Sequence, residues 1–377
     1  MAAPNPLDPS SYHHRFVRVA SGRRYHLVDQ PPAHWRGPVE QAPTVLLAHG
    51  FPDLWYGWRY QIAAFAARGW RVLCPTQLGY GDSDKPVDLE AYGHKSVAYD
   101  MNSLLDECRA KRVVVVGHDW GGMVAWRLVD YFPHRVISVA SVCTPYMPPA
   151  QPSSPYTPAE EWVRTKLPNF GYQLFFQKET SAAKIEQVLP QFFAGNFSQA
   201  TRADASRKVR NAVQEGVMER IVDEMIESQR QGKQLKTPPS EPVRLSSLPP
   251  RPSPPSPLEL VVDSPDSPGQ EFDYYLSTFR RTGLHSALNW YRTRLINHCD
   301  EQASQIPPFP EHIPALVLPA ENDLALPPSM AESPAVRKCF PGGNLEDPRY
   351  RAHVTGLLAD FVEESFAKEE AGPLAKL

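Results

Sequence analysis

Short apolar runs alternate with segments of helical spacing along residues 1–145. The runs Phe16–Val19 and Tyr25–Val28 flank a Ser-Gly pair, which predicts a hairpin. Further apolar runs predict strands at Thr44–Ala48, Val72–Cys74, Val113–Val116, Val136–Val142 and, much later, Ala315–Leu318. Helices are predicted at Tyr60–Arg68 and Met123–Tyr131. Strands that alternate with helices predict an α/β protein with a mostly parallel, doubly wound sheet covered on both faces.

From about residue 146 to residue 305 this alternation gives way to a long, aromatic and helical stretch. We expect an inserted helical cap there, between a first part of the core at residues 1–145 and a second part at residues 306–377. Inside the insert, eleven prolines fall between Thr237 and Pro268. Proline continues neither a helix nor a central strand, so residues 237–268 are interpreted as a disordered or extended insertion. Translated intron sequence is the alternative explanation.

Composition narrows the class of protein. With 377 residues, 42% of them apolar, the chain can form one large domain with a smaller one inserted. The net charge of -3 comes without any basic block, which argues against a nucleic-acid surface. The five cysteines are scattered, odd in number and without CxxC spacing, so neither a disulfide framework nor a zinc site is expected.

The expected location is cytoplasmic or peroxisomal. Scattered free cysteines fit a reducing compartment. No apolar run is long enough to span a membrane, and the N-terminal residues lack the apolar region of a signal peptide. The last three residues, Ala375-Lys376-Leu377, resemble a peroxisomal address, with a chance tripeptide as the alternative.

The strongest chemical signal is the hexapeptide GHDWGG at residues 117–122, between the Val113–Val116 run and the helix that follows. A strand, a tight turn of small residues and a helix are the setting of the nucleophile elbow, and Asp119 stands at the nucleophile position. A carboxylate with an ordinary pKa of about 3.9 is ionised at neutral pH and needs no base. It suits displacement at a saturated carbon, which gives an alkyl-enzyme ester. An aspartate that merely caps the following helix is the alternative.

The loop HGFP at residues 49–52 follows the Thr44–Ala48 run. In this position relative to the elbow, such a loop supplies one backbone N–H to an oxyanion hole, and the residue after the nucleophile supplies the other. This assigns the amides of Phe51 and Trp120 to the oxyanion hole. Taken alone, the four residues would also fit a simple strand-to-loop turn.

Three motifs in order, HGFPDLWYGWRYQI, GYGDSDKP and GHDWGG, resemble the N-terminal half of soluble epoxide hydrolases of the α/β-hydrolase fold. The resemblance continues in the insert at NFGYQLFFQ and LNWYR. It implies an α/β-hydrolase fold with a helical cap, in which Tyr172 and Tyr291 hydrogen-bond the epoxide oxygen and help to protonate it. A phenol of pKa about 10 is protonated at neutral pH, as a donor to a leaving alkoxide must be. Packing of the cap is the alternative role of both tyrosines.

The segment PALVL followed by AEND resembles the strand and loop that carry the acid of the family. This assigns Asp323 to orient and charge-stabilise a histidine, with a turn aspartate as the alternative. After that acid the family places one more short strand and a Gly-His-Trp or Ser-His-Trp element. This chain reads PGGNLEDPRYRAHVTGLLADFVEE there, so we expect the last strand to be missing or degraded and the histidine segment to be absent.

The other histidines fit a structural role better. His353 lies among apolar residues at helical spacing, so it is expected in the closing helix, with service as the base as the alternative. His285, His298 and His312 belong to the cap or its return linker. The resulting hypothesis is an enzyme that opens an epoxide to an ester whose hydrolysis is in doubt.

The expected substrate is a small apolar epoxide, because the predicted cap is aromatic. Neither a metal nor an organic cofactor is implied, and the oligomeric state stays open. A haloalkane or haloacid dehalogenase is one alternative, although Tyr172 and the NWYR segment favour the epoxide. A non-catalytic protein of the same fold is another, since fold does not confer function. Mis-splicing would explain both the Pro-rich insert and the histidine gap.

Overall fold

The computed structural model describes residues 3–197, 212–232, 268–321, 323–340, 345–346 and 354–371. The Pro-rich segment lies outside these residues except for Pro268, which begins a helix. His353 and the tripeptide Ala375-Lys376-Leu377 also lie outside them. None of the described helices has the length and hydropathy needed to cross a membrane.

Among the described residues, the core is an eight-stranded sheet in the order β1-β2-β4-β3-β5-β6-β7-β8. The strands are β1 (His14–Arg18), β2 (Arg24–Gln30), β3 (Thr44–Ala48), β4 (Arg71–Pro75), β5 (Val113–His118), β6 (Val136–Val142), β7 (Ala315–Leu318) and β8 (Leu345–Glu346). β1 and β2 form the predicted antiparallel hairpin, and β2 also pairs antiparallel with β4. All other neighbours pair in parallel, which confirms the mostly parallel sheet.

Strand β8 lies where the sequence predicts the last strand to be missing or degraded. It has two residues, and it pairs in parallel with β7 through Ala315 opposite Leu345 and Leu316 opposite Glu346. The strand is therefore present but very short. The central strands are better defined by their sequence, because the four valines of β5 are fully buried and β-branched side chains pack well inside a sheet.

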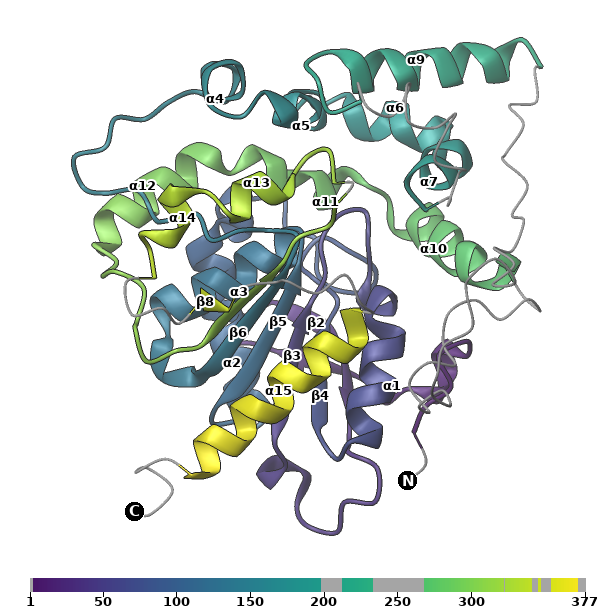
Figure 1. Cartoon of the computed structure of the whole chain (residues 1–377). Coiled ribbons are helices and arrows are strands. Elements are labelled where there is room, and N and C mark those ends of the chain that lie inside the picture. The colour runs from purple at the N-terminus through teal and green to yellow at the C-terminus, as the bar shows by residue number, and fades with distance from the viewer. Residues whose placement is uncertain are drawn as a thin grey trace, which may run out of the picture.

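Helices cover the sheet and extend beyond its end (Figure 1). The core helices are α1 (Arg59–Ala67), α2 (His94–Glu107), α3 (Trp120–Tyr131), α13 (Pro328–Ala331), α14 (Pro334–Arg337) and α15 (Val354–Ala371). α15 crosses in front of the strands in Figure 1 and contacts α1, whereas α2 and α3 pack against each other. Short 3-10 helices lie at Pro9–Ser11, Val39–Gln41, Trp55–Trp58, Leu89–Tyr92, Pro133–Arg135, Pro168–Phe170 and Asn289–Arg292.

Between β6 and β7 the chain leaves the sheet and forms the inserted helices, drawn above the sheet in Figure 1. They are α4 (Ala159–Thr165), α5 (Gly171–Phe176), α6 (Ser181–Gln187), α7 (Leu189–Phe197), α9 (Val217–Arg230), α10 (Pro268–Thr282), α11 (His285–Leu288) and α12 (Arg294–Ser304). Helical character was predicted for this stretch. The exact division into residues 1–145, 146–305 and 306–377 stays a prediction.

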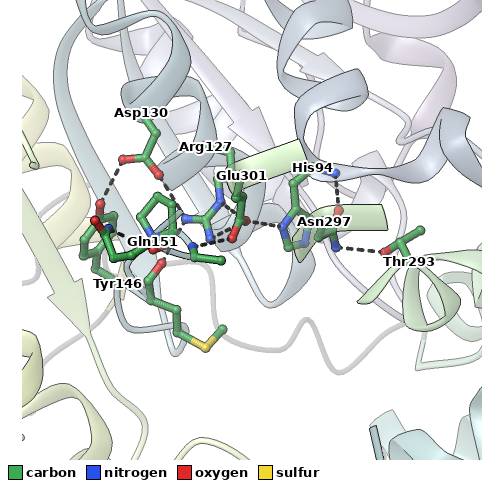
Figure 2. Close-up of polar contacts among 11 residues, drawn as sticks. His94, Arg127, Asp130, Tyr146, Gln151, Thr293, Asn297 and Glu301 are labelled. Carbon is green, nitrogen blue, oxygen red and sulfur yellow. Dashed lines mark hydrogen bonds and ion pairs between the residues drawn. The ribbon is translucent and has the colours of Figure 1, made fainter. Parts of the chain in front are cut away.

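A buried ion network joins α3 of the core to α12 of the insert (Figure 2). The Arg127 guanidinium lies 2.8 Å from a carboxylate oxygen of Glu301 and 3.0 Å from one of Asp130. The Tyr146 hydroxyl donates to Asp130 at 2.9 Å. The side chains of Arg127, Asp130 and Glu301 are 3%, 0% and 8% exposed, so these charges depend on one another rather than on water.

The two carboxyl groups of the network respond to pH in opposite ways. Burial alone would raise the pKa of Glu301, but Arg127 and His94 outweigh it and lower the pKa to about 2 from the usual 4.5. Glu301 therefore contributes stability that is present above pH 4.5 and is lost as the pH falls through about 2. Burial raises the pKa of Asp130 to about 6 against the opposing effect of Arg127, so its contribution is lost as the pH rises through about 6.

Replacing the arginine of this network should destabilise the fold strongly. Arg127→Met is expected to lower the free energy of unfolding by about 3–5 kcal/mol, because it leaves buried carboxylates without their cation. Urea denaturation at neutral pH measures the loss. Arg281→Gln is the control, because its ion pair with Asp82 is 58% and 45% exposed and such pairs contribute about 0–1 kcal/mol. The gap between wild type and Arg127→Met should narrow as the pH falls below 4.5, and a gap independent of pH would contradict this account.

Candidate active site

Asp119 lies at the sharp turn between β5 and α3, where the sequence predicts a nucleophile elbow. Its backbone has φ 54° and ψ -123°, a conformation that non-glycine residues seldom adopt. The turn is tight because a Cβ on Gly117 would lie 2.0 Å from the Gly121 carbonyl oxygen, and one on Gly121 would lie 2.0 Å from that of Ala48. The Asp119 side chain makes no capping hydrogen bond to α3, which argues against the helix-cap alternative.

Backbone amides hold the Asp119 carboxylate instead. The Phe51 N–H, on the loop after β3, donates to Asp119 Oδ1 at 2.9 Å. The backbone N–H of Trp120 also stabilises the ionised carboxylate. The loop and the elbow meet so closely that a Cβ on Gly50 would lie 2.3 Å from Asp119 Oδ1. The two amides assigned from the sequence, those of Phe51 and Trp120, thus both hydrogen-bond to the Asp119 carboxylate.

The Asp119 carboxylate is partly buried at the wall of a cavity, and this affects its ionisation. Burial raises the pKa of Asp119 above its usual value, while His118 and the amides of Phe51 and Trp120 oppose the rise. A carboxylate that is desolvated and yet held ionised by amides is a better nucleophile than one solvated by water.

The two tyrosines assigned from the sequence come from separate inserted helices and meet over this site. Tyr172 lies in α5 and Tyr291 in the 3-10 helix Asn289–Arg292, with ring centroids 6.3 Å apart. The Tyr291 ring lies 5.2 Å from Trp120 and 5.6 Å from Phe51. Burial raises the pKa of both phenols, and the charge of Asp119 raises both further. Both phenols are therefore protonated donors close to the carboxylate.

Asp323 lies on the loop after β7. Its Oδ1 accepts hydrogen bonds from the amides of Ala325 and Leu326, both at 2.9 Å. Burial raises the pKa of the Cys143 thiol to about 12, and the Asp323 carboxylate, which accepts a hydrogen bond from that thiol, contributes to the rise. Asp323 is therefore held in a fixed orientation.

A cavity of about 460 Å³ brings part of the assigned set together. Its described lining is Phe51, Pro52, Asp53, His118, Asp119, Cys143, Asn196, Asp323, Ala325 and Leu326. Phe51, Asp119 and Asp323 thus face one space, while Trp120, Tyr172 and Tyr291 adjoin it through ring contacts without lining it. This lining mixes charged, polar and apolar groups, so the apolar nature of the substrate stays a prediction.

Cys143 and Asn196 were not singled out from the sequence, although both line the cavity. A signal for Cys143 was available. It directly follows β6, the neighbour of β5, and carboxyl ends of parallel strands meet at one edge of the sheet. Asn196 offers no comparable signal, because its place depends on how α7 packs.

The described histidines occupy different places. His49 is buried between the Gly50 carbonyl oxygen, 3.0 Å from Nδ1, and the Gln77 N–H, which donates to Nε2 at 2.9 Å. Burial lowers the pKa of His49 to about 4, so it is neutral and has no free nitrogen for a base. His118 lines the cavity beside Asp119. His298 lies in α12, with its ring 5.4 Å from that of Tyr156.

Comparison with known proteins supports one family. Residues 43–344 match the family model described as alpha/beta hydrolase fold. Bifunctional epoxide hydrolase 2 of Mus musculus is 31% identical over 358 residues, which cover 91% of this chain and 53% of the mouse protein. Epoxide hydrolase A of Mycobacterium tuberculosis is 34% identical over 256 residues, or 67% of each chain. The chain spans about half the length of its mammalian relatives.

Solved structures agree on the fold. The crystal structure of epoxide hydrolase A from Mycobacterium thermoresistibile superposes with a TM-score of 0.62 at 25% identity, over 93% of this chain and 98% of that one. An epoxide hydrolase from an endophytic Streptomyces gives a TM-score of 0.68 at 23% identity, over 95% and 96% of the two chains.

A methyl group at the elbow should disrupt it. In Gly121→Ala the new Cβ would lie 2.0 Å from a backbone oxygen that cannot move aside, so the free energy of unfolding should fall by about 1–3 kcal/mol or more. Thermal unfolding followed by circular dichroism measures the effect. Gly356→Ala in α15 is the matched control, because its Cβ meets nothing within 4 Å and alanine favours a helix by about 1 kcal/mol. Equal melting temperatures for the two variants would argue against a close-packed elbow.

Proposed function

Because the chain belongs to the alpha/beta hydrolase fold family, we propose that it acts on epoxides as its relatives' names indicate, with Asp119 as the nucleophile. The observation that carries the proposal is the contact between the Phe51 N–H and the Asp119 carboxylate, at an elbow that opens into a cavity. A serine at the elbow would need a base, whereas a carboxylate attacks carbon directly.

In the first half-reaction, one carboxylate oxygen of Asp119 attacks an epoxide carbon. The carbon–oxygen bond of the ring breaks, its electron pair goes to the oxygen, and a phenol proton of Tyr172 or Tyr291 neutralises the alkoxide. The raised pKa of each phenol keeps this proton in place until the alkoxide, a far stronger base, forms. The products are a hydroxyalkyl ester of Asp119 and a phenolate, which regains a proton from water.

In the second half-reaction, water adds to the ester carbonyl, and the amides of Phe51 and Trp120 stabilise the oxyanion. A base must take a proton from that water. Asp323 is proposed to orient and charge-stabilise a histidine for this step, with its own orientation fixed by the amides of Ala325 and Leu326. The histidine segment that the resemblance implies is not visible in the sequence, and His353 lies outside the described residues. We therefore propose that ester formation is faster than ester hydrolysis in this chain.

The inserted helices are proposed to act as a cap over the cavity. Asn196 of α7 lines it, and Tyr172 of α5 reaches its edge. The cap would exclude water from the reacting epoxide and supply both phenols.

Incubation with an aryl epoxide such as styrene oxide should leave one epoxide on each chain. Intact-protein mass spectrometry should show an adduct that persists, because ester hydrolysis is the slow step. Asp119→Asn should give no adduct, and Asp53→Asn, which alters another cavity carboxylate, should still give one. Repeated diol formation without a persistent adduct would contradict slow hydrolysis. An adduct on Asp119→Asn would contradict the assignment of the nucleophile.

The rate of adduct formation should depend on pH in one direction only. Asp119 must be ionised to attack, and burial raises its pKa, so the rate should fall on the acid side at a higher pH than for an ordinary aspartate of pKa about 3.9. No loss of rate is expected up to about pH 10, since both phenols hold their protons beyond the ordinary pKa.

The double variant Tyr172→Phe/Tyr291→Phe should form the adduct about 10²-fold more slowly or worse, because it lacks both proton donors. A double variant as fast as wild type would remove the phenols from the reaction.

A further inference from the structure

The two helices joined by the buried ion network each begin at a reacting group. α3 begins at Trp120, directly after Asp119. α12 begins at Arg294, just after the 3-10 helix that holds Tyr291. Arg127 and Glu301 lie about two turns into their respective helices. The ion pair therefore links the two helices at similar distances along the chain from Asp119 and Tyr291.

The link between the helices is directional (Figure 2). Arg127 Nε and Nη2 both approach Glu301 Oε1, at 3.0 and 2.8 Å. Glu301 Oε2 accepts the Ala150 N–H at 2.9 Å, and Arg127 Nη1 donates to the Met147 carbonyl oxygen at 2.9 Å. Each charged group is thus fixed from more than one side, and a pair held this way resists sliding of one helix along the other.

A chain of hydrogen bonds continues from the ion pair toward Tyr291 (Figure 2). The His94 ring nitrogen Nδ1 lies 3.5 Å from Glu301 Oε1, and the His94 backbone N–H donates to Asn297 Oδ1 at 2.7 Å. The Asn297 amide donates to the Thr293 hydroxyl at 3.0 Å. That hydroxyl donates to the carbonyl oxygen of Trp290 at 3.0 Å, one residue before Tyr291.

Ring contacts also connect His94 to Tyr291, through Trp120, the residue after Asp119. The His94 ring lies 6.1 Å from the Trp120 ring, and Trp120 lies 6.1 Å from Trp290 and 5.2 Å from Tyr291. The groups facing His94 are Glu301 and Asp300 of α12, Arg127 of α3 and Trp120. Burial lowers the pKa of His94, so it fills this position as a neutral ring.

The exposed pair of Arg281 and Asp82 provides a contrast. It also joins an inserted helix, α10, to the core, but its two side chains are 58% and 45% exposed, and they hydrogen-bond to each other. It therefore serves as a comparison pair that connects the insert to the core outside the network of Arg127 and Glu301.

We propose that Glu301, held by its ion pair with Arg127, is a positioning residue that keeps the Tyr291 phenol close to the Asp119 carboxylate. The inference rests on the proposed function for its chemical consequence, although the placement of Tyr291 can be measured separately.

The kinetic test follows adduct formation on the full-length protein with styrene oxide, comparing wild type with Glu301→Gln and Arg127→Lys below their melting temperatures. The rate constant at saturating epoxide should fall on the order of 10- to 100-fold, because small misplacements of a reacting group have effects of this size. The final amplitude should stay at one adduct per chain, and the half-saturating concentration should change little. A purely structural role would instead lower the amplitude, through loss of folded protein, and leave the rate constant unchanged. Asp82→Asn is the matched control and should keep the wild-type rate.

The placement test does not need catalysis. In protein labelled with 3-fluorotyrosine, the ¹⁹F resonance of Tyr291 is assigned by its loss in Tyr291→Phe. Glu301→Gln should shift or broaden that resonance, whereas Asp82→Asn should not. An unmoved resonance in Glu301→Gln overturns the positioning role. If wild type forms no adduct but the resonance moves, the proposed function fails and the positioning role stands.

Discussion

The 2.9 Å contact between the Phe51 N–H and the Asp119 carboxylate is the interaction on which the rest of the site depends. Removing a carboxylate from water is costly unless hydrogen bonds compensate it, and here the compensating amides belong to the loop after β3 and the start of α3. The contact requires β3 and β5 to lie side by side in parallel, with glycines where the two turns touch. Burial, and next to it the charge of Asp119, raises the pKa of the Tyr172 and Tyr291 phenols, so both keep their protons.

Much of the sheet was predictable because its determinants are local. The runs Thr44–Ala48, Val136–Val142 and Ala315–Leu318 match β3, β6 and β7 residue for residue, since buried parallel strands are continuous apolar runs bounded by polar or turn residues. The start of α3 was placed at Met123 but lies at Trp120. Two glycines occupy its first turn and weaken the helical signal, while close packing against β3 fixes the helix there.

The site was predictable only where motifs carried it. Asp119, Phe51 and Asp323 share a cavity as their motifs imply, but Tyr172 and Tyr291 were assigned by resemblance and could not have been paired from spacing alone. Arg127 lies on a core helix and Glu301 on the last helix of the insert, and nothing local marks either residue as buried. Charged residues are expected at the surface, so a buried pair of this kind becomes visible only when the two helices are in place. β8 was not predicted as a strand, because two residues are too few to form a recognisable apolar pattern.

In the proposed reaction, an oxygen of Asp119, and not of water, bonds to the epoxide carbon. The most direct measurement is reaction with styrene oxide in H₂¹⁸O, followed by alkaline release of the product in the same water and mass analysis of both partners. Alkali cleaves the ester at its carbonyl, so the account predicts a diol without ¹⁸O and an Asp119 carboxyl that carries it. A diol labelled with ¹⁸O beside an unlabelled Asp119 would mean that water attacked the epoxide directly, and it would contradict the account.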